Sequence, residues 1–207
     1  MLFRSPALQR ELQRISEDTF RCKRIIDDLR DFSRRHDLEL APSDLNRLVE
    51  DALGLISHQE VFSRITIVRE FGSHMPAVPC DSARMEQVLA NVLVNALQAM
   101  PQGGSLSVGT ALRSDFAEIS IHDTGPGIPN EIRSRIFDPF FTTKPQGTGL
   151  GLSIVYRIME AHGGKVELES VTQGHAQEGT LRQVGTRVVL LLRLRAKNAD
   201  TKAAAVH

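Results

Sequence analysis

Two glycine clusters, separated by a short charged and aromatic segment, constrain this chain more than any other feature. The first cluster lies in residues 125–127 and the second in residues 147–151, where it runs into a helix-forming segment that extends to His162. Glycines just before a helix let the backbone approach an anion closely, and the unpaired N–H groups of the first helical turn then point at that anion. The pattern therefore predicts a phosphate-binding loop with a mobile cover.

The composition is that of a soluble globular protein, with 207 residues, 41% hydrophobic and 24% charged. Because the formal net charge is zero, nucleic acid and an anionic membrane surface are weak expectations for partners. No apolar run approaches the ~18 residues of a spanning helix, and the N-terminus shows no secretory signal. Cys22 and Cys80 have no metal-ligand spacing, so we expect reduced thiols in a cytoplasmic protein, although a disulfide stays open.

The N-terminal segment predicts one long helix over residues 8–32, within a first unit of residues 1–35. Its apolar positions alternate in spacing between four and three: Leu8, Leu12, Ile15, Thr19, Cys22, Ile26 and Leu29. Such a heptad seam favours packing against another helix, and we expect a homodimer through residues 8–32. The alternative is that the helix folds back onto its own domain.

The rest of the chain predicts a linker at 36–44, a domain at 45–195 and a disordered tail at 196–207. Helices are expected at 45–62, from Asp81 or Ser82 to 100, and at 150–162, with a loop at 72–79. Strands are expected at 65–70, 105–112, 116–122, 165–170 and 186–194, with the second and third forming a hairpin. This order predicts an α+β fold, a two-layer α/β sandwich with a mixed, mostly antiparallel sheet and helices on one face.

Asn91 and Asn95 stand four residues apart in the helix-forming run MEQVLANVLVNALQAM, so both amides lie on one helical face. Unpaired buried amides cost about 1–3 kcal/mol each, and the pair therefore needs partners. One interpretation is capping by local backbone. The other is a phosphate or hard-cation site, because an amide oxygen can ligate Mg²⁺.

Asp123 ends a predicted strand and is followed by Thr-Gly-Pro-Gly-Ile. A carboxylate there can accept a hydrogen bond from an exocyclic amine, and the glycines let a flat ring lie against the backbone. Other phosphate motifs fit poorly: the P-loop pattern fails at residues 163–166, and the Rossmann pattern fails at Leu152. The order of the motifs is more specific than any one of them.

In that order, residues 43–195 resemble the ATP-binding catalytic domain of bacterial two-component sensor histidine kinases, in the GHKL superfamily with the Bergerat fold. Residues 91–95 resemble the asparagine box, 123–128 the first glycine box, 137–144 the phenylalanine box and 147–153 the second glycine box. The run Phe-Asp-Pro-Phe-Phe-Thr-Thr-Lys is most similar to the nitrogen-regulation and oxygen-sensing subgroup. The N-terminal helix is similar to the second helix of the dimerisation domain.

The resemblance implies that the chain binds ATP or ADP with Mg²⁺ as a protein-histidine kinase upstream of a response regulator. The implied nucleotide-binding residues are Asn91, Asn95, Asp123, Gly125, Gly127, Ile128, Phe140, Thr143, Lys144, Gly147, Thr148, Gly149, Leu150, Gly151, Leu152 and Thr186.

Each implied residue has a role by the same resemblance. Asp123 would bind the adenine amine, assisted by Gly127 and Thr186. Asn95 would ligate Mg²⁺, and residues 149–151 would offer backbone N–H groups to the phosphates. Ile128 and Phe140 would wall the base.

Asn91 and Lys144 are the implied catalytic residues. Asn91 would orient phosphate or water. Lys144 would contact the γ-phosphate from the lid, which is the mobile cover of residues 129–146 between the two glycine clusters. The alternative for Lys144 is a solvated lysine. Catalysis would come from positioning and charge neutralisation.

The family also needs an acceptor histidine followed by an acidic residue and, three positions further on, Asn or Thr. His36 is followed by Asp37 but has Leu40 at the third position, and none of the seven histidines completes the motif. We therefore expect a fragment that cannot phosphorylate itself and whose acceptor histidine is supplied by a dimerisation domain.

Two other classes of function stay open. One is another GHKL enzyme, such as a serine-directed anti-sigma kinase or an ATP-driven clamp, although clamps usually place a catalytic Glu where Asn91 stands. The other is a nucleotide-binding dimerisation module without activity, against which the intact glycine boxes argue.

Overall fold

The computed structural model describes residues 38–144, 147–172 and 184–194, together with isolated positions among the first 37 residues. A five-stranded sheet in the order β2-β4-β5-β7-β6 forms one layer. Its strands are β2 (Ile65–Phe71), β4 (Gly104–Arg113), β5 (Phe116–Asp123), β6 (Lys165–Val171) and β7 (Gly185–Arg193). Strands β2 and β4 are parallel, and the remaining neighbours are antiparallel.

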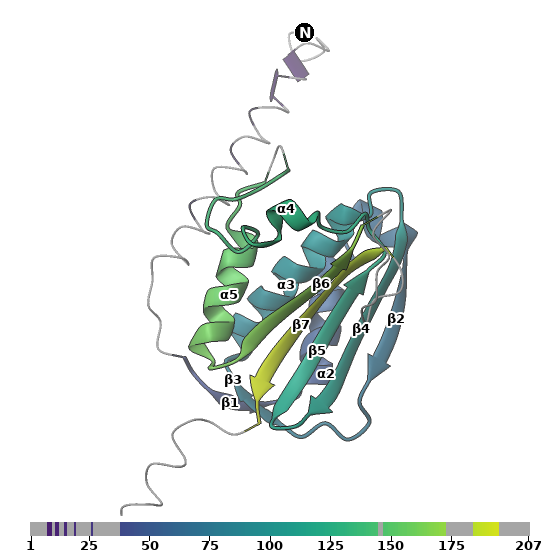
Figure 1. The fold of residues 1–207 in the computed structure, drawn as a ribbon. Coiled ribbons are helices and arrows are strands. Elements are labelled where there is room, and N and C mark those ends of the chain that lie inside the picture. The colour runs from purple at the N-terminus through teal and green to yellow at the C-terminus, as the bar shows by residue number, and fades with distance from the viewer. Residues whose placement is uncertain are drawn as a thin grey trace, which may run out of the picture.

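Helices α2 (Leu45–Ile56), α3 (Ser82–Ala99) and α5 (Gly151–Ala161) form the second layer, and Figure 1 shows all of them on one face of the sheet. A short helix, α4 (Asn130–Arg133), lies in the segment between the glycine clusters. The predicted α+β, two-layer fold with a mostly antiparallel sheet is confirmed.

Strand β5 explains where the sheet presents polar groups. Its residues alternate strictly between buried and half-buried, and the buried ones are Ala117, Ile119, Ile121 and Asp123. The first of these are ordinary core residues, because alternate side chains of a strand share a face. Asp123 is the last inward-facing position of the strand, so the chain directs a carboxylate into the layer between sheet and helices.

Helix α3 is the central helix and contacts both α2 and α5. Asp81 caps it by accepting a hydrogen bond from the N–H of Arg84 at 3.1 Å. Its apolar stripe is fully buried and includes Met85, Leu89, Leu93 and Leu97. His162, at the end of α5, accepts from the N–H of Asp81 through Nε2 at 3.0 Å and ties the two helices together.

Two boundary predictions were wrong. The helix predicted over 45–62 ends at Ile56, where the hydroxyl of Ser57 donates to the carbonyl of Gly54, and a separate 3₁₀ turn, η2, covers Glu60–Arg64. In addition, β1 (Ala41–Ser43) lies in the predicted linker and pairs with β3 (Val78–Cys80), whose first two residues end the predicted loop. Pro42 and Pro79 face each other in that pair, and prolines conceal a strand pattern because they cannot donate to the ladder.

The isolated positions described near the N-terminus all have helical conformation. Among them, Leu8, Leu12, Ile15, Thr19 and Ile26 belong to the predicted seam, and each is exposed. Cys22 and Leu29, the rest of the seam, lie outside the described residues, as does the tail 196–207. The single helix over 8–32 and its dimerisation therefore stay predictions. Cys80 is buried and free.

Candidate functional site

The predicted base-binding carboxylate is the centre of one half of the site. Asp123 is only 6% exposed and stands opposite Thr186 of β7, which is 8% exposed. The N–H of Gly125 donates to Oδ1 of Asp123 at 2.8 Å. Burial raises the pKa of Asp123 to about 6, although backbone hydrogen bonds from Gly125 and Thr186 and the charge of Lys144 oppose that rise.

The glycine loop after Asp123 is tied to the end of β6 by a residue that the sequence prediction missed. The hydroxyl of Ser170 accepts from the N–H of Ile128 at 2.7 Å and donates to the carbonyl of Gly185 at 3.0 Å. It also lies 3.2 Å from the hydroxyl of Thr186. Ser170 continues the alternation of Val166 and Leu168 on the inward face, and a polar residue in that register was the available signal.

Arg133 of α4 fastens the same loop from the lid side. Its Nε donates to the carbonyl of Ile128 at 3.1 Å, and its guanidinium also donates to the carbonyl of Ser170. Gly127 has a φ of +76°, and a Cβ there would lie 2.3 Å from the carbonyl oxygen of Val171. Only glycine fits this approach of the loop to β6.

The second half of the site joins α3 to the start of α5. A Cβ placed on Gly151 would lie 3.6 Å from Oδ1 of Asn91 and 3.9 Å from Nδ2 of Asn95. Both amides therefore face the first turn of α5. Leu150 is the N-cap residue of α5, and its side chain makes no capping hydrogen bond. The N–H groups of the first turn carry the positive end of the helix dipole, and they point toward the two amides.

The lid passes over the second glycine cluster. Gly149 has a φ of +71°, and a Cβ there would lie 2.3 Å from the carbonyl carbon of Phe140. Phe140 itself has a φ of +67° and a side chain that is 60% exposed. Thr143 is also exposed. The contacts of Phe140 and Thr143 with a nucleotide stay predictions.

Lys144 reaches from the lid to α3. Its ammonium donates to Oδ1 of Asn95 at 2.9 Å and to Oε1 of Gln98 at 2.7 Å. Burial lowers the pKa of Lys144, while the negative charge of Asp123 opposes that shift. Lys144 is thus a paired lysine rather than a solvated one in this structure, and Gln98 is a second residue that the sequence prediction missed.

The remaining predicted residues differ in whether their side chain or only their backbone lies at the site. Leu150 is fully buried, so only its backbone faces the site, where its N–H lies 3.4 Å from the hydroxyl of Thr148. Gly125 is wedged between Asp123 and α3, since a Cβ would lie 2.8 Å from that of Ala99. Gly147 donates its N–H to the carbonyl of Lys144 at 3.1 Å, and Leu152 is half-buried in the first turn of α5.

The donor set fits a magnesium nucleotide. Among the described residues there is no group of three or more His, Cys, Asp or Glu side chains that could hold a metal alone. Mg²⁺ is commonly held by one or two protein oxygens together with substrate phosphates. Amide oxygens on α3 beside the positive end of α5 meet that requirement.

A family model described as "Histidine kinase-, DNA gyrase B-, and HSP90-like ATPase" matches residues 80–196. The chain belongs to this ATPase family. The match contains the asparagine pair, both glycine clusters, the lid and strands β4 to β7. It begins at Cys80, at the end of β3, so α2 and β2 lie before it.

Within the family, the chain is similar to bacterial sensor histidine kinases. It is 36% identical to the signal transduction histidine-protein kinase AtoS of Escherichia coli over 80% of this chain and 28% of AtoS. It is also 36% identical to the sensor protein FixL of Bradyrhizobium diazoefficiens over 83% of this chain and 35% of FixL. The chain therefore spans about a third of the length of these relatives.

Solved structures agree with this assignment. Full-length ShkA in complex with AMPPNP has a TM-score of 0.75 at 25% identity, covering 93% of this chain and 40% of ShkA. The histidine kinase ThkA in complex with the response regulator TrrA has a TM-score of 0.76 at 26% identity, covering 95% of this chain and 54% of that chain. The predicted resemblance to the catalytic domain of sensor histidine kinases is confirmed.

None of the helices in the described part of the chain combines the length and the apolar character that a membrane-spanning helix needs.

The raised pKa of Asp123 gives a pH prediction for adenine nucleotides. If the ionised carboxylate accepts from the base, protons compete with the ligand below the pKa of about 6. We expect the Kd to be constant above about pH 7 and to rise roughly tenfold per pH unit below the pKa. Calorimetric titration across this range measures it.

The control for that titration is magnesium tripolyphosphate, which shares the titrating phosphates but has no base. It should lose affinity only through its own protonation. Equal pH dependence for the two ligands would contradict a contact between Asp123 and the base.

Proposed function

We propose that this chain is the ATP-binding catalytic part of a sensor histidine kinase, which transfers the γ-phosphoryl group of Mg²⁺-bound ATP to a histidine of a dimerisation domain. The observation that carries the proposal is the pair Asn91 and Asn95 facing the uncapped start of α5, in a chain of this ATPase family. That arrangement offers amide oxygens and backbone N–H groups to the two kinds of charge that a magnesium nucleotide carries.

The base belongs at the other half of the site. Asp123 would accept from the exocyclic amine of adenine, with Gly127 and Thr186 beside it. Gly125 and Thr186 donate backbone hydrogen bonds to this carboxylate, and its remaining lone pairs can accept from the amine. Burial strengthens such a hydrogen bond relative to one exposed to water.

The phosphates belong between α3 and the lid. Asn95 would hold Mg²⁺, which supplies charge neutralisation on the phosphates when bound. Asn91 would orient phosphate or water, and the N–H groups of residues 149–151 would bind the phosphate oxygens. Lys144 would contact the γ-phosphate after leaving its amide partners.

The partners of this activity follow from the relatives. Sensor histidine kinases and the ThkA complex with a response regulator support a downstream response regulator for this chain. The predicted seam in residues 8–32 supports a homodimer, and the acceptor histidine would lie on a dimerisation helix. We expect the reaction to take place in the cytoplasm, where ATP is available.

Phosphoryl transfer is favoured over ATP hydrolysis by one observation. ATP-driven clamps of the superfamily usually place a water-activating glutamate where this chain has Asn91, and an amide cannot act as a general base at neutral pH. A serine-directed kinase of the same superfamily is the second candidate, and the identity of the phosphorylated residue separates the two.

The test supplies a dimerisation domain that carries an acceptor histidine, together with radiolabelled ATP and Mg²⁺. We expect acid-labile label on that histidine and none on a variant of the domain with the histidine replaced by glutamine. We also expect no label on the chain when it is incubated alone. Release of phosphate without transfer, or label on serine, would contradict the proposal.

A further inference from the structure

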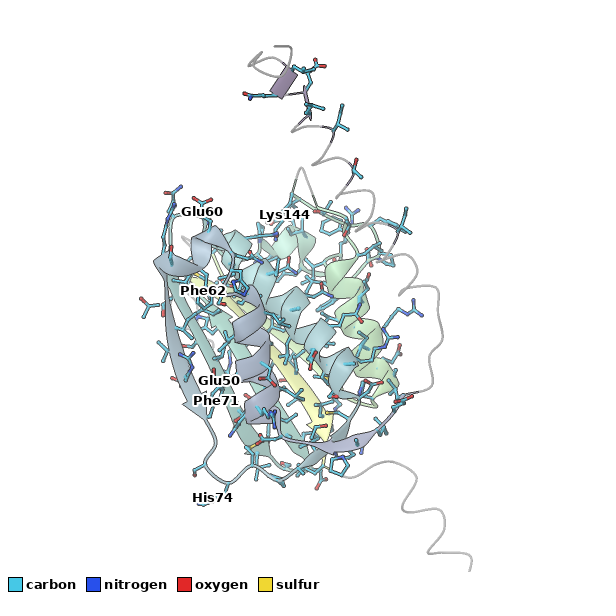
Figure 2. All side chains as sticks on the ribbon, turned by 180° about the vertical axis from the view of Figure 1, so that it is seen from behind. Glu50, Glu60, Phe62, Phe71, His74 and Lys144 are labelled. Carbon is cyan, nitrogen blue, oxygen red and sulfur yellow. The ribbon has the colours of Figure 1, made fainter. Side chains whose placement is uncertain are left out.

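Gln98 helps to hold Lys144 of the lid on the side-chain oxygen of Asn95, which the proposed function assigns to Mg²⁺. It stands three residues after Asn95 on α3, so the two amides share one helical face. The Lys144 ammonium lies between them, 2.9 Å from Oδ1 of Asn95 and 2.7 Å from Oε1 of Gln98. Figure 2 shows Lys144 at the same end of the molecule as Glu60 of η2.

The side chain of Gln98 is accessible to the lysine of the lid. This side chain is exposed, and Gln98 lines an open pocket of about 440 Å³ together with residues of η2 and the end of α3. The lid turn around Lys144 is closed locally, because the N–H of Lys144 donates to the Thr142 hydroxyl at 3.1 Å. The side chain of Lys144 can therefore exchange its partners without dismantling that turn.

The oxygen of Asn95 cannot serve Lys144 and Mg²⁺ together. Both are cations, and an oxygen that coordinates Mg²⁺ at about 2 Å would bring the ammonium within a few ångströms of it. In a half-buried site the repulsion of two such charges is larger than in water. Lys144 must therefore leave Asn95 when the metal arrives.

We propose that Gln98 is the positioning residue that keeps Lys144 docked on Asn95, so that lid docking and Mg²⁺ binding exclude each other. This rests on the proposed role of Asn95 as the metal ligand. Gln98 does not itself take part in that role, and it sets how readily Lys144 gives up the shared oxygen. A released Lys144 is then available to the phosphates of the nucleotide.

The proposal has a consequence for the Mg²⁺ concentration that half-saturates nucleotide binding. This concentration should fall when Lys144 binds Asn95 and Gln98 more weakly. Gln98→Met keeps the length of the side chain and removes the acceptor. Since Gln98 is exposed, we expect the variant to fold as the wild type does.

Two measurements on the full chain test this. The first is hydrogen exchange of lid residues 138–144 without nucleotide, in which Gln98→Met should speed exchange and Gln98→Glu, which keeps an acceptor, should not. The second is the Mg²⁺ concentration that half-saturates AMPPNP binding, which should fall about threefold to tenfold in Gln98→Met. Gln102→Met, at an exposed glutamine in the following turn, is the matched control and should change neither.

An unchanged or higher Mg²⁺ requirement in Gln98→Met overturns the inference, whatever happens to lid exchange, provided that the wild type binds AMPPNP. If the wild type itself binds none, the proposed function fails first and the inference falls with it.

Discussion

Asp123→Asn is expected to make the chain more stable and much poorer at binding adenine nucleotides. The gain in stability follows from the pKa of Asp123, which burial raises from 3.8 to about 6. Because folding favours the protonated form, this group's contribution to stability is complete below about pH 4 and is lost as the pH rises through about 6. At neutral pH the buried charge therefore costs up to about 3 kcal/mol.

Asparagine removes that charge and keeps one acceptor oxygen, Oδ1, for the backbone donors Gly125 and Thr186. We expect the free protein to gain about 1–3 kcal/mol at pH 7, which is roughly 2–10 °C in Tm. The amide nitrogen would then face the amine of adenine, and a donor opposite a donor cannot bond. Loss of the charged hydrogen bond should weaken AMPPNP binding by about tenfold to a hundredfold.

Asp115→Asn is the matched control, because Asp115 is exposed in the turn before β5, at the opposite end of the strand from Asp123. It should change stability by no more than about 0.5 kcal/mol and leave the affinity alone. Thermal melts and calorimetric titrations measure both quantities. An Asp123→Asn protein with wild-type affinity would contradict the base-binding role.

Gly127→Ala is expected to lower both stability and nucleotide affinity. A side chain at a φ of +76° is strained by about 1–2 kcal/mol. The added Cβ would also lie 2.3 Å from the Val171 carbonyl oxygen, so the loop must move away from β6. That movement opposes the hydrogen bond from Ile128 to Ser170, and it should reduce AMPPNP affinity by at least about tenfold, the loss of one hydrogen bond.

Gly163→Ala separates the two causes. Gly163 has a φ of +63°, and a Cβ there meets nothing within 4 Å. It lies just beyond the C-terminal end of α5, whereas the site is at the start of that helix. We expect it to cost about 1–2 kcal/mol of stability and no affinity. Equal effects of the two substitutions on affinity would contradict a specific role for the Gly127 loop.

The sequence predicted the parts of the fold that carry strong periodicity. The apolar stripe of α3 and the alternation of β5 each have a local cause, and the helix and the strand were both predicted. The start of α3 was predicted at Asp81 or Ser82, and Asp81 is the N-cap. The strands β1 and β3 were missed because their facing prolines hide the strand pattern. The end of α2 was missed because it depends on a local hydrogen bond from the Ser57 hydroxyl to the carbonyl of Gly54.

The residues of the site that were predicted also follow a local pattern, and those that were missed do not. The glycines and the asparagine pair are visible because their spacing is local. Ser170 and Gln98 were missed because each acts through a residue distant in sequence, Ile128 in one case and Lys144 in the other. Such contacts depend on how the strands and the lid are brought together, which periodicity does not encode.

A calorimetric titration of the chain with AMPPNP and with its guanine counterpart, each with Mg²⁺ and with EDTA, tests the proposed function most directly. We expect tight binding of AMPPNP with Mg²⁺, clearly weaker binding with EDTA, and little binding of the guanine nucleotide. Absence of AMPPNP binding, or equal affinity for the two bases, would contradict it.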